Sequence, residues 1–276
     1  MKRILTFLAM FLMVGIAHAA YNIRQQGDGS MVFEYSRDKT APVKITNKGD
    51  LENFGRRIQW FDDFLGDALN AQYSISAGVD AQAVAPAISV ANKGIVRLTT
   101  GNAGTGALTD GSSLTQELVW KASNGGLVME ANVTLSSAAN IVVNVGFTDA
   151  KADNTLEIPI EVSGTSTLTT NASDAVVFAY DTNTTTDNWK CVGVSSNTDA
   201  TVASSGITPV ASTYQKLRIE VDTSGNADFF IDGSKVCTVA SAVSTATTLT
   251  PIVVATARTT TSKNVDVDYL FIAQNR

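Results

Sequence analysis

Two glutamates, Glu157 and Glu161, are the residues of this sequence best suited to catalysis. They stand four positions apart in the segment 156–161 (LEIPIE), on one expected strand, with Pro159 between them. A pair of carboxylic acids can hydrolyse a glycosidic bond, one as nucleophile and the other as general acid and base. Four residues of strand, however, span about 13 Å, whereas the two carboxyl groups of a retaining glycosidase lie about 5–5.5 Å apart. The alternative is two solvent-facing acids beside a strand edge or bulge, which the proline would mark because it cannot donate to a sheet ladder.

Aromatic side chains that could stack on a sugar form a second group. Trp189 follows the polar loop 182–188 (TNTTTDN), and Tyr180 precedes that loop. An aromatic ring can pack on the face of a sugar while Asp187 binds its hydroxyl groups, so we expect a glycan site at Trp189, Tyr180 and Asp187. The alternative is that the rings pack in the core, which is common for Trp in a β-sandwich. The other aromatic residues open to the same two interpretations are Trp60, Trp120 and Tyr214.

The elements that must position these residues are β-strands. In 216–221 (KLRIEV) apolar and charged residues alternate, which is typical of a strand with one buried face. Ser224-Gly225 and Asp232-Gly233 then indicate tight hairpin turns. Strands joined by short turns predict an all-β fold, a two-sheet antiparallel jelly-roll sandwich. The expected strands are 94–100, 116–121, 127–135, 140–148, 156–162, 174–180, 188–195, 215–222, 226–232, 235–240, 250–257 and 264–273.

Three segments follow one another along the chain. Residues 1–19 have the pattern of a secretory signal peptide: Lys2 and Arg3, an apolar run, and small residues at Ala17 and Ala19. Residues 20–58 form a polar N-terminal arm or short hairpin, interpreted as an attachment to a larger assembly or as a solvated extension. Residues 59–276 form the sandwich domain, a length that one all-β domain can have. The apolar run of the leader is shorter than the roughly 20 residues that span a membrane.

Charge and composition exclude several classes of function. Without Lys2 and Arg3 the chain has 18 basic and 26 acidic residues, a net charge of −8. No run of basic residues is present, which argues against nucleic acid and anionic membranes as partners. The single histidine, His18, lies in the leader. The remaining sequence therefore cannot use a Ser-His-Asp or Cys-His mechanism, nor a histidine-ligated metal.

The two cysteines, Cys191 and Cys237, both lie in expected strands. In an exported protein they could form a disulfide across neighbouring strands. They could equally be two buried free thiols, which behave as small apolar side chains. A disulfide needs Cα atoms closer than about 7 Å, so the sequence leaves both alternatives open.

The segments 214–236 (YQKLRIEVDTSGNADFFIDGSKV) and 265–274 (VDVDYLFIAQ) resemble the concanavalin A-like lectin and glucanase superfamily, which includes laminin-G-like domains. This resemblance implies a jelly roll that hosts lectins, hydrolases and structural modules alike. In glucanases of this group an aspartate stands between the two catalytic glutamates, and here that position is Pro159. The departure argues against catalysis by Glu157 and Glu161.

The resemblance also implies a structural calcium ion. In this group the final Val-Asp-Tyr strand often lends its aspartate to Ca²⁺ beside the first strand, and Asp268 matches that position. Asp62 and Asp63 would lie nearby if the first and last strands pair. Calcium takes about six to eight oxygen ligands, some of them backbone carbonyls. The alternative is that Asp268 and Asp63 are surface carboxylates.

The segments WFDDFLGDALNAQY, GIVRLTTGNAG and DAVVFAYDT are similar to tailed-phage and environmental-virus proteins that are thought to be virion components. The resemblance implies a non-enzymatic decoration or appendage protein on the virion surface, attached through its N-terminal arm, able to contact host glycans and to form a homo-oligomer. The leader departs from this pattern. It favours the alternative, a secreted, periplasmic or cell-surface bacterial carbohydrate-binding module. A glucan hydrolase using Glu157 and Glu161 is the most distant alternative.

Overall fold

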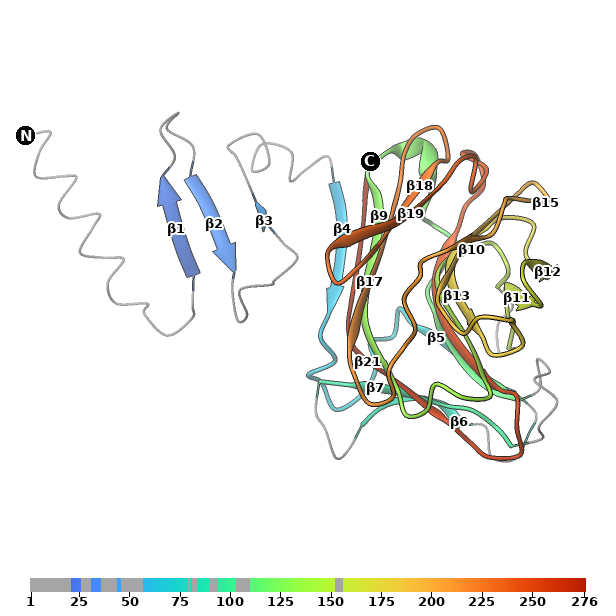
Figure 1. The fold of residues 1–276 in the computed structure, drawn as a ribbon. Helices are drawn as coiled ribbons and strands as arrows, with labels where there is room; N and C mark the ends of the chain where they lie inside the picture. Colours follow the sequence, from blue (N-terminus) through green and yellow to red (C-terminus); the bar gives the residue numbers. More distant parts are fainter. Residues whose placement is uncertain are drawn as a thin grey trace, which may run out of the picture. The chain divides into compact units, whose positions relative to one another are not determined.

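The computed structural model describes residues 21–25, 31–35, 44–45, 57–78, 80, 84–89, 94–102, 110–151 and 156–276. The predicted signal peptide lies outside these residues. The chain divides into two units, Met1–Arg57 and Ile58–Arg276. In the first unit the strands β1 (Tyr21–Gln25), β2 (Met31–Tyr35) and β3 (Lys44–Ile45) form a small antiparallel sheet (Figure 1).

The second unit is built from antiparallel strands. They are β4 (Arg57–Asp62), β5 (Ser74–Ala77), β6 (Val84–Ile88), β7 (Val96–Thr99), β8 (Gly111–Thr115), β9 (Leu127–Leu135), β10 (Ile141–Thr148), β11 (Ile160–Ser163), β12 (Thr167–Thr170), β13 (Ala175–Asp181), β14 (Lys190–Ser195), β15 (Thr198–Asp199), β16 (Ala203–Ser204), β17 (Gln215–Val221), β18 (Ala227–Ile231), β19 (Ser234–Val239), β20 (Thr250–Ala257) and β21 (Asn264–Asn275). A short 3₁₀ turn, η3 (Ala122–Asn124), precedes β9.

Most of these strands belong to two sheets that pack face to face (Figure 1). The open sheet has the order β19-β18-β17-β9-β21-β7-β6, and β4 also pairs with β21. The covered sheet has the order β15-β14-β13-β10-β20-β8-β5, and β16 also pairs with β14. The two-sheet antiparallel sandwich predicted from the alternation is therefore confirmed.

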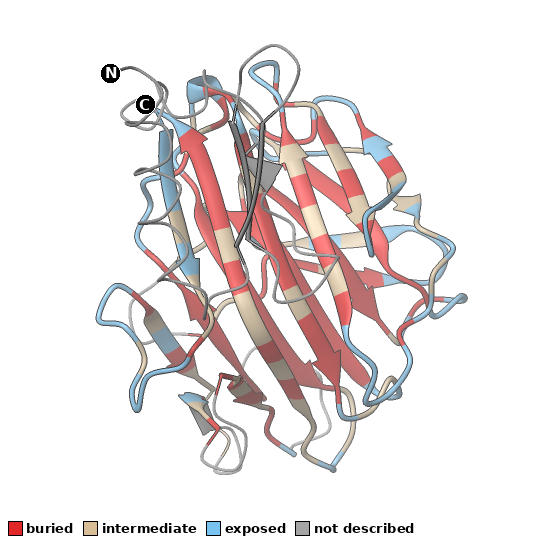
Figure 2. Ribbon diagram, turned by 90° about the vertical axis from the view of Figure 1, so that its left-hand side faces the viewer, coloured by how far each residue is buried: buried red, intermediate tan, exposed pale blue. Residues whose placement is uncertain are grey.

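The main core fills the space between the two sheets. In β9 the side chains of Leu127, Met129, Ala131, Val133 and Leu135 are all buried there. The alternate positions of that strand carry Val128, Glu130, Asn132 and Thr134, which lie on the outer face of the open sheet. Figure 2 looks onto this sheet, whose front strands alternate between buried and intermediate positions. This is the pattern of a sheet with one face in the core.

The covered sheet differs because both of its faces are buried. Every residue of β10, β13 and β20 is buried. The outer face lies under the β11–β12 hairpin and the segment that precedes it, on the side away from β9 and β17 (Figure 1). Leu156, Ile158, Ile160 and Val162 pack there as a second apolar core. Strands buried on both faces have continuous apolar runs, such as 175–179 (AVVFA), instead of alternation.

Cys191 and Cys237 form a disulfide with a Cα–Cα distance of 6.4 Å. Cys191 lies in β14 of the covered sheet and Cys237 in β19 of the open sheet. The sequence left a disulfide and two free thiols open; the disulfide forms, but it joins the two sheets and not neighbouring strands of one sheet. In the part of the chain that the structure describes, no helix is long and apolar enough to cross a membrane.

Candidate functional site

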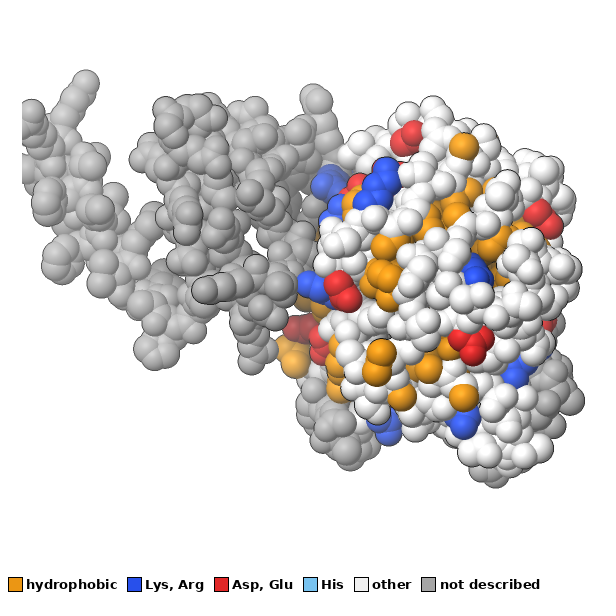
Figure 3. All heavy atoms as spheres, in the orientation of Figure 1, with side chains coloured by type: hydrophobic (Ala, Val, Ile, Leu, Met, Phe, Trp, Pro, Cys, Tyr) orange, Lys and Arg blue, Asp and Glu red, His pale blue; other side chains and the backbone are white. Residues whose placement is uncertain are grey.

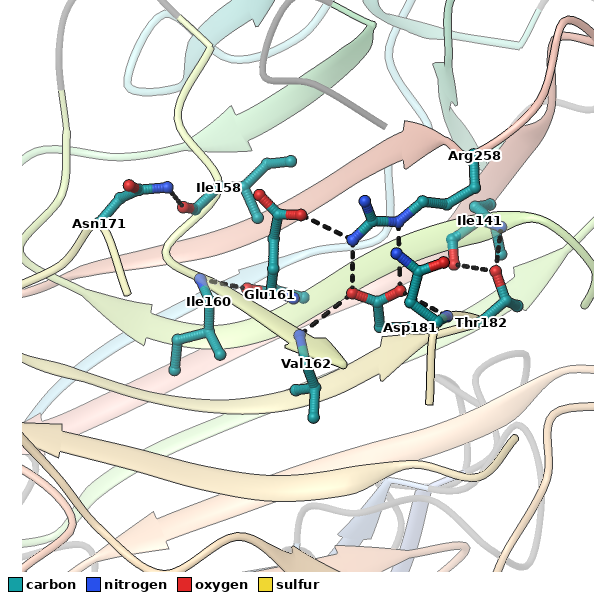
Figure 4. A network of polar contacts seen from close by, with 11 residues as sticks. Ile141, Ile158, Ile160, Glu161, Val162, Asn171, Asp181, Thr182 and Arg258 are labelled. Carbon is teal, nitrogen blue, oxygen red and sulfur yellow. Dashed lines mark hydrogen bonds and ion pairs between the residues drawn. The ribbon is translucent and has the colours of Figure 1, made fainter. Parts of the chain in front are cut away.

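Glu157 and Glu161 do not share a strand, which corrects the first expectation. β11 begins at Ile160, directly after Pro159, and Glu157 lies in the irregular segment before it. Proline has no N–H to donate, so the strand starts only beyond it. Glu161 accepts a hydrogen bond from Arg258 Nη2 at 2.6 Å, and the same nitrogen lies 2.7 Å from Asp181 Oδ2 (Figure 4). The carboxylate of Glu161 is thus held in an ion pair.

Asp181 is the centre of this network. Its side chain is fully buried, and it accepts backbone hydrogen bonds from Val162 at 3.1 Å and Asn183 at 2.9 Å (Figure 4). Burial lowers the pKa of Arg258, but the hydrogen bond and the attraction to Asp181, followed by those to Glu161, outweigh it and raise that pKa. Asn144 Oδ1 accepts from the backbone of Ile160 at 3.0 Å. Side chains of the covered sheet therefore hold the hairpin, and Glu161 has a structural environment.

Glu157 lies on the same side of the covered sheet but in a different environment. It lines a small polar pocket over β5, β8 and β20, together with Ser76, Ser113, Thr115, Ala150, Lys151 and Ile252. Lys151 Nζ lies 3.2 Å from Glu117, which is largely exposed. This pocket and the Arg258 network contain one predicted glutamate each. Glu157 and Glu161 therefore do not face one another across a shared site.

The predicted glycan site at Trp189, Tyr180 and Asp187 is also corrected. Trp189 and Tyr180 are 0% and 1% exposed, and both rings pack in the main core. Trp189 Nε1 donates to Gln215 Oε1 at 2.9 Å, and the Tyr180 hydroxyl donates to the Ala138 carbonyl. Burial raises the pKa of Tyr180 to about 12. Asp187 alone is exposed, so no aromatic platform forms there. Trp120 is buried as well.

The outer face of the open sheet brings together groups that the sequence did not associate. Glu130 of β9 is opposite Arg218 of β17 and Phe271 of β21. The hydroxyl of Tyr269 donates to Glu130 Oε1 at 2.5 Å. Glu130 is only 5% exposed although it points away from the core. Burial raises its pKa, while the Tyr269 hydrogen bond and the charge of Arg218 act in the opposite direction.

Asp268, the predicted calcium ligand, lies beside this pair. A β-bulge between Val267 and Tyr269 displaces it from the regular register, and its Oδ2 accepts from Asn132 Nδ2 at 3.0 Å. Asp63 follows β4, which does pair with the last strand. Among the described residues, however, no three Asp, Glu, His or Cys side chains gather as metal ligands. The side chains at Asp268 and Asp63 do not by themselves fit the oxygen shell of calcium, so calcium stays a prediction.

Two further aromatic rings complete the outer face. Phe61 of β4 is 54% exposed, and its ring centroid lies 5.9 Å from that of Tyr269. The guanidinium of Arg218 lies 4.6 Å from the ring centroid of Phe230 and forms an ion pair with Glu220. We call Phe61, Tyr269, Glu130, Asn132 and Asp268 the aromatic–acidic face. It presents one exposed ring, a half-buried phenol and three polar side chains on a rigid sheet.

Charge on this side of the sandwich is largely paired. Arg97 donates to both oxygens of Asp266 at 2.7 Å, and Lys235 lies 2.7 Å from Asp228. On the side of the molecule drawn in Figure 3, basic and acidic side chains are scattered among uncharged ones without a block of either sign.

The aromatic–acidic face was missed at the sequence level because its members are distant in the chain. Glu130 and Asn132 are the polar positions of one alternating strand, and Tyr269 is in another. Only the pairing of β9 with β21 and of β4 with β21 makes them neighbours. The Val-Asp-Tyr segment for which calcium was predicted lies in β21, next to Glu130 and Asn132 of β9.

Among known proteins, this chain resembles solved structures in its fold. No protein-family model and no curated protein matches the sequence. Among solved structures, the β-glucanase of Bacillus licheniformis matches with a TM-score of 0.54 and 10% identity, covering 78% of this chain and 97% of that one. The carbohydrate recognition domain of Emp47p matches with a TM-score of 0.53 and 10% identity, covering 80% and 98%. The cellulose induced protein Cip1 matches with a TM-score of 0.51 and 14% identity, covering 76% and 95%.

These matches show a fold shared with a β-glucanase and a carbohydrate recognition domain, in agreement with the two-sheet jelly roll expected from the sequence. They include both a hydrolase and a carbohydrate recognition domain, so the fold does not decide between catalysis and binding. Function has to be argued from the residues that this chain itself presents.

Proposed function

We propose that this protein is an exported, non-enzymatic carbohydrate-binding β-sandwich, and that it binds glycan on the aromatic–acidic face of its open sheet. The observation that carries this proposal is the exposed ring of Phe61 against Tyr269, beside the side chains of Glu130, Asn132 and Asp268. The apolar C–H face of a sugar packs on an aromatic ring, while its hydroxyls donate to carboxylates and exchange hydrogen bonds with an amide. An aromatic surface with a few fixed polar groups has the general composition of a ligand site.

The position of the face on paired strands supports this role. A flat sheet surface accommodates an extended polymer better than a small molecule, which would need a deep pocket to be enclosed. The core beneath β9 and β21 holds these side chains in place, so little side-chain entropy is lost on binding. The likeness in fold to a carbohydrate recognition domain is compatible with the proposal.

The non-enzymatic part of the proposal rests on the two predicted acids. Glu161 is engaged by Arg258, and Glu157 lies in a separate polar pocket. Neither acid faces the other, and Pro159 occupies the position between them. Hydrolysis of mixed-linkage β-glucan should therefore not exceed that of a Glu161→Gln variant. Turnover by the wild type that the substitution abolishes would contradict this part of the proposal.

The binding experiment uses a panel of immobilised polysaccharides, including mixed-linkage β-glucan, mannan and chitin. For the polymer that binds, Phe61→Ala and Tyr269→Ala should each weaken binding about tenfold, or about 1.4 kcal/mol. Ile75→Ala is the matched control, because Ile75 is 38% exposed but lies on β5 of the other sheet. Binding that is lost equally in all three variants, or absent for every polymer, would overturn the proposed site.

Where the protein is located remains a prediction from the leader and the viral resemblance. Mass spectrometry of N-terminal peptides from purified particles and from the secreted fraction tests it. A chain that starts at Ala20 and occurs only in the secreted fraction would favour the secreted module over the virion appendage.

A further inference from the structure

Most edge strands of the sandwich are protected in some way against pairing with another chain, and β5 (Ser74–Ala77), the end strand of the covered sheet, is only four residues long. β6 contains Pro86 and has a register shift against β7. β19 has Lys235 and a bulge against β18, while β15 and β16 are only two residues long. Proline, bulges, lysine and short length all prevent an edge from pairing with another chain. These features make the other edges poor docking surfaces.

β4 (Arg57–Asp62) differs from these edges. It pairs with β21 along one side, and its other side has no partner strand among the described residues. It is six residues long, without proline or lysine, and Ile58 and Phe61 are 39% and 54% exposed. Trp60, between them, packs only partly against the main core. An unpaired edge with open apolar side chains is a template for strand addition.

The sequence of β4 is suited to pairing with a second copy of itself. A twofold axis perpendicular to the sheet makes the two strands antiparallel and keeps each side chain on its own face. The sequence numbers of two residues that lie opposite one another, one from each copy, must then differ by an even number. With Gln59 on the axis, Ile58 comes opposite Trp60 of the second copy and Arg57 comes opposite Phe61 of the second copy.

This register gives two favourable cross-strand pairs. Ile58 and Trp60, on the core-facing side, would cover one another, and an aromatic opposite a β-branched residue is a favourable cross-strand pair. Arg57 could stack on the Phe61 ring as a cation–π contact. With Trp60 on the axis instead, Ile58 would come opposite Asp62 of the second copy, which buries an acid against an apolar side chain. The register centred on Gln59 is therefore the better one.

We infer that β4 is a homodimerisation edge, through which the open sheets of two copies form one continuous antiparallel sheet. Six-residue strands bury less area than a standard stable interface, so the dimer should dissociate on dilution. The test at Ile58 is separate from the proposed glycan site, because Ile58 lies on the opposite side of β4 from Phe61, although this register also places Arg57 of the second copy beside the Phe61 ring.

Analytical ultracentrifugation of the full chain across a dilution series tests the inference. The wild type should form a dimer that dissociates on dilution. Ile58→Asp should raise the dissociation constant of this dimer at least tenfold. Val210→Asp is the matched control, because Val210 is 60% exposed in a loop away from β4. A monomeric wild type, or an oligomer that Ile58→Asp leaves intact, would overturn the inference.

A second variant tests the register. Both native cysteines are in the Cys191–Cys237 bond, so Gln59→Cys introduces the only free thiol. With Gln59 on the axis, two such thiols face one another, and mild oxidation should give a covalent dimer. Ile75→Cys, exposed on another edge, should give no covalent dimer under the same conditions. Equal cross-linking of the two variants would mean random collision and would contradict the register. Circular dichroism confirms that each variant is folded.

Discussion

The outer faces of the two sheets bury carboxylates in contrasting ways. On the covered sheet, Asp181 has Arg258 as a partner and two backbone N–H donors, beneath a hairpin with its own apolar core. On the open sheet, Glu130 is nearly as buried, but its direct partner is the neutral hydroxyl of Tyr269. A buried charge is tolerated when a cation and hydrogen bonds compensate for lost water. Asp181 therefore stabilises the fold. Glu130 has no direct cationic partner among the described residues, so its burial lowers stability, as is common for polar groups in binding sites.

The largest effect should follow the loss of the compensated carboxylate. Asp181→Ala leaves Arg258 without its buried partner and removes the acceptor for Val162 and Asn183. Removing one member of a buried ion pair costs about 3–5 kcal/mol of unfolding free energy. Glu161→Gln, whose side chain is 23% exposed, should cost much less. Urea unfolding of both variants decides this, and equal losses would mean that Asp181 is not the centre of the network.

A second substitution pair compares the covered face with the open one directly. Ile160→Ala removes a fully buried side chain under the hairpin and should cost about 2–5 kcal/mol. Phe61→Ala removes a larger side chain that is half exposed, and should change stability by no more than about 0.5 kcal/mol. Thermal unfolding measures both. A large loss for Phe61→Ala would show that this ring is structural and would weaken its assignment to glycan binding.

The disulfide provides a third test, because it joins the two sheets. Cys191 and Cys237 are 46 positions apart, and closing a loop of that length restricts the unfolded chain. The Cys191→Ala/Cys237→Ala double variant should lose about 2–4 kcal/mol. Reducing the wild type before unfolding should give the same loss. A reduced wild type as stable as the oxidised one would show that the packing of the layers alone suffices.

The smallest expected effect is a change in pH dependence at Glu130. Its pKa is raised in the folded protein because of burial, so the folded state keeps this proton at pH values where the unfolded chain has released it. Stability should therefore fall as the pH rises from the ordinary glutamate pKa to the raised one. The Glu130→Gln variant has no ionisable group at this position. Its stability relative to the wild type should therefore increase as the pH rises through this range. Urea midpoints at a series of pH values measure this, and a constant difference between the two proteins would contradict it.

The parts of the fold with one buried face were predictable from sequence, and the parts with two buried faces were less so. The alternation in 215–221 and 127–135 gave β17 and β9 almost to the residue. No strand was expected at β8 (GSSLT), which lies fully buried in the covered sheet. The strand expected at 116–121 is wrong, because that segment forms only an isolated bridge between Trp120 and Leu249. The small polar residues of β8 fit between the main core and the outer side of the covered sheet. Their own sequence, however, shows neither alternation nor an apolar run that would predict a buried strand.

Site residues were less predictable than strands, for the same reason. Trp189 and Tyr180 look the same in sequence whether their rings point to solvent or to the core, and the choice depends on the strand register. The partners of Glu161 and Glu130 come from residues more than 90 positions away, Arg258 and Tyr269. Local spacing showed which acids were present. Only the assembled sheets show which of them have a cation beside them.

The bond between Cys191 and Cys237 also determines what survives a break in the chain. The segment between the two cysteines contains exposed turns at Ser196–Asn197 and around Val210. A protease that cuts there would leave two fragments still tied to one another through sulfur. The nicked protein would migrate as one molecule until a reductant separates the two fragments. Proteolytic cleavage in these exposed turns therefore would not release either fragment from the domain.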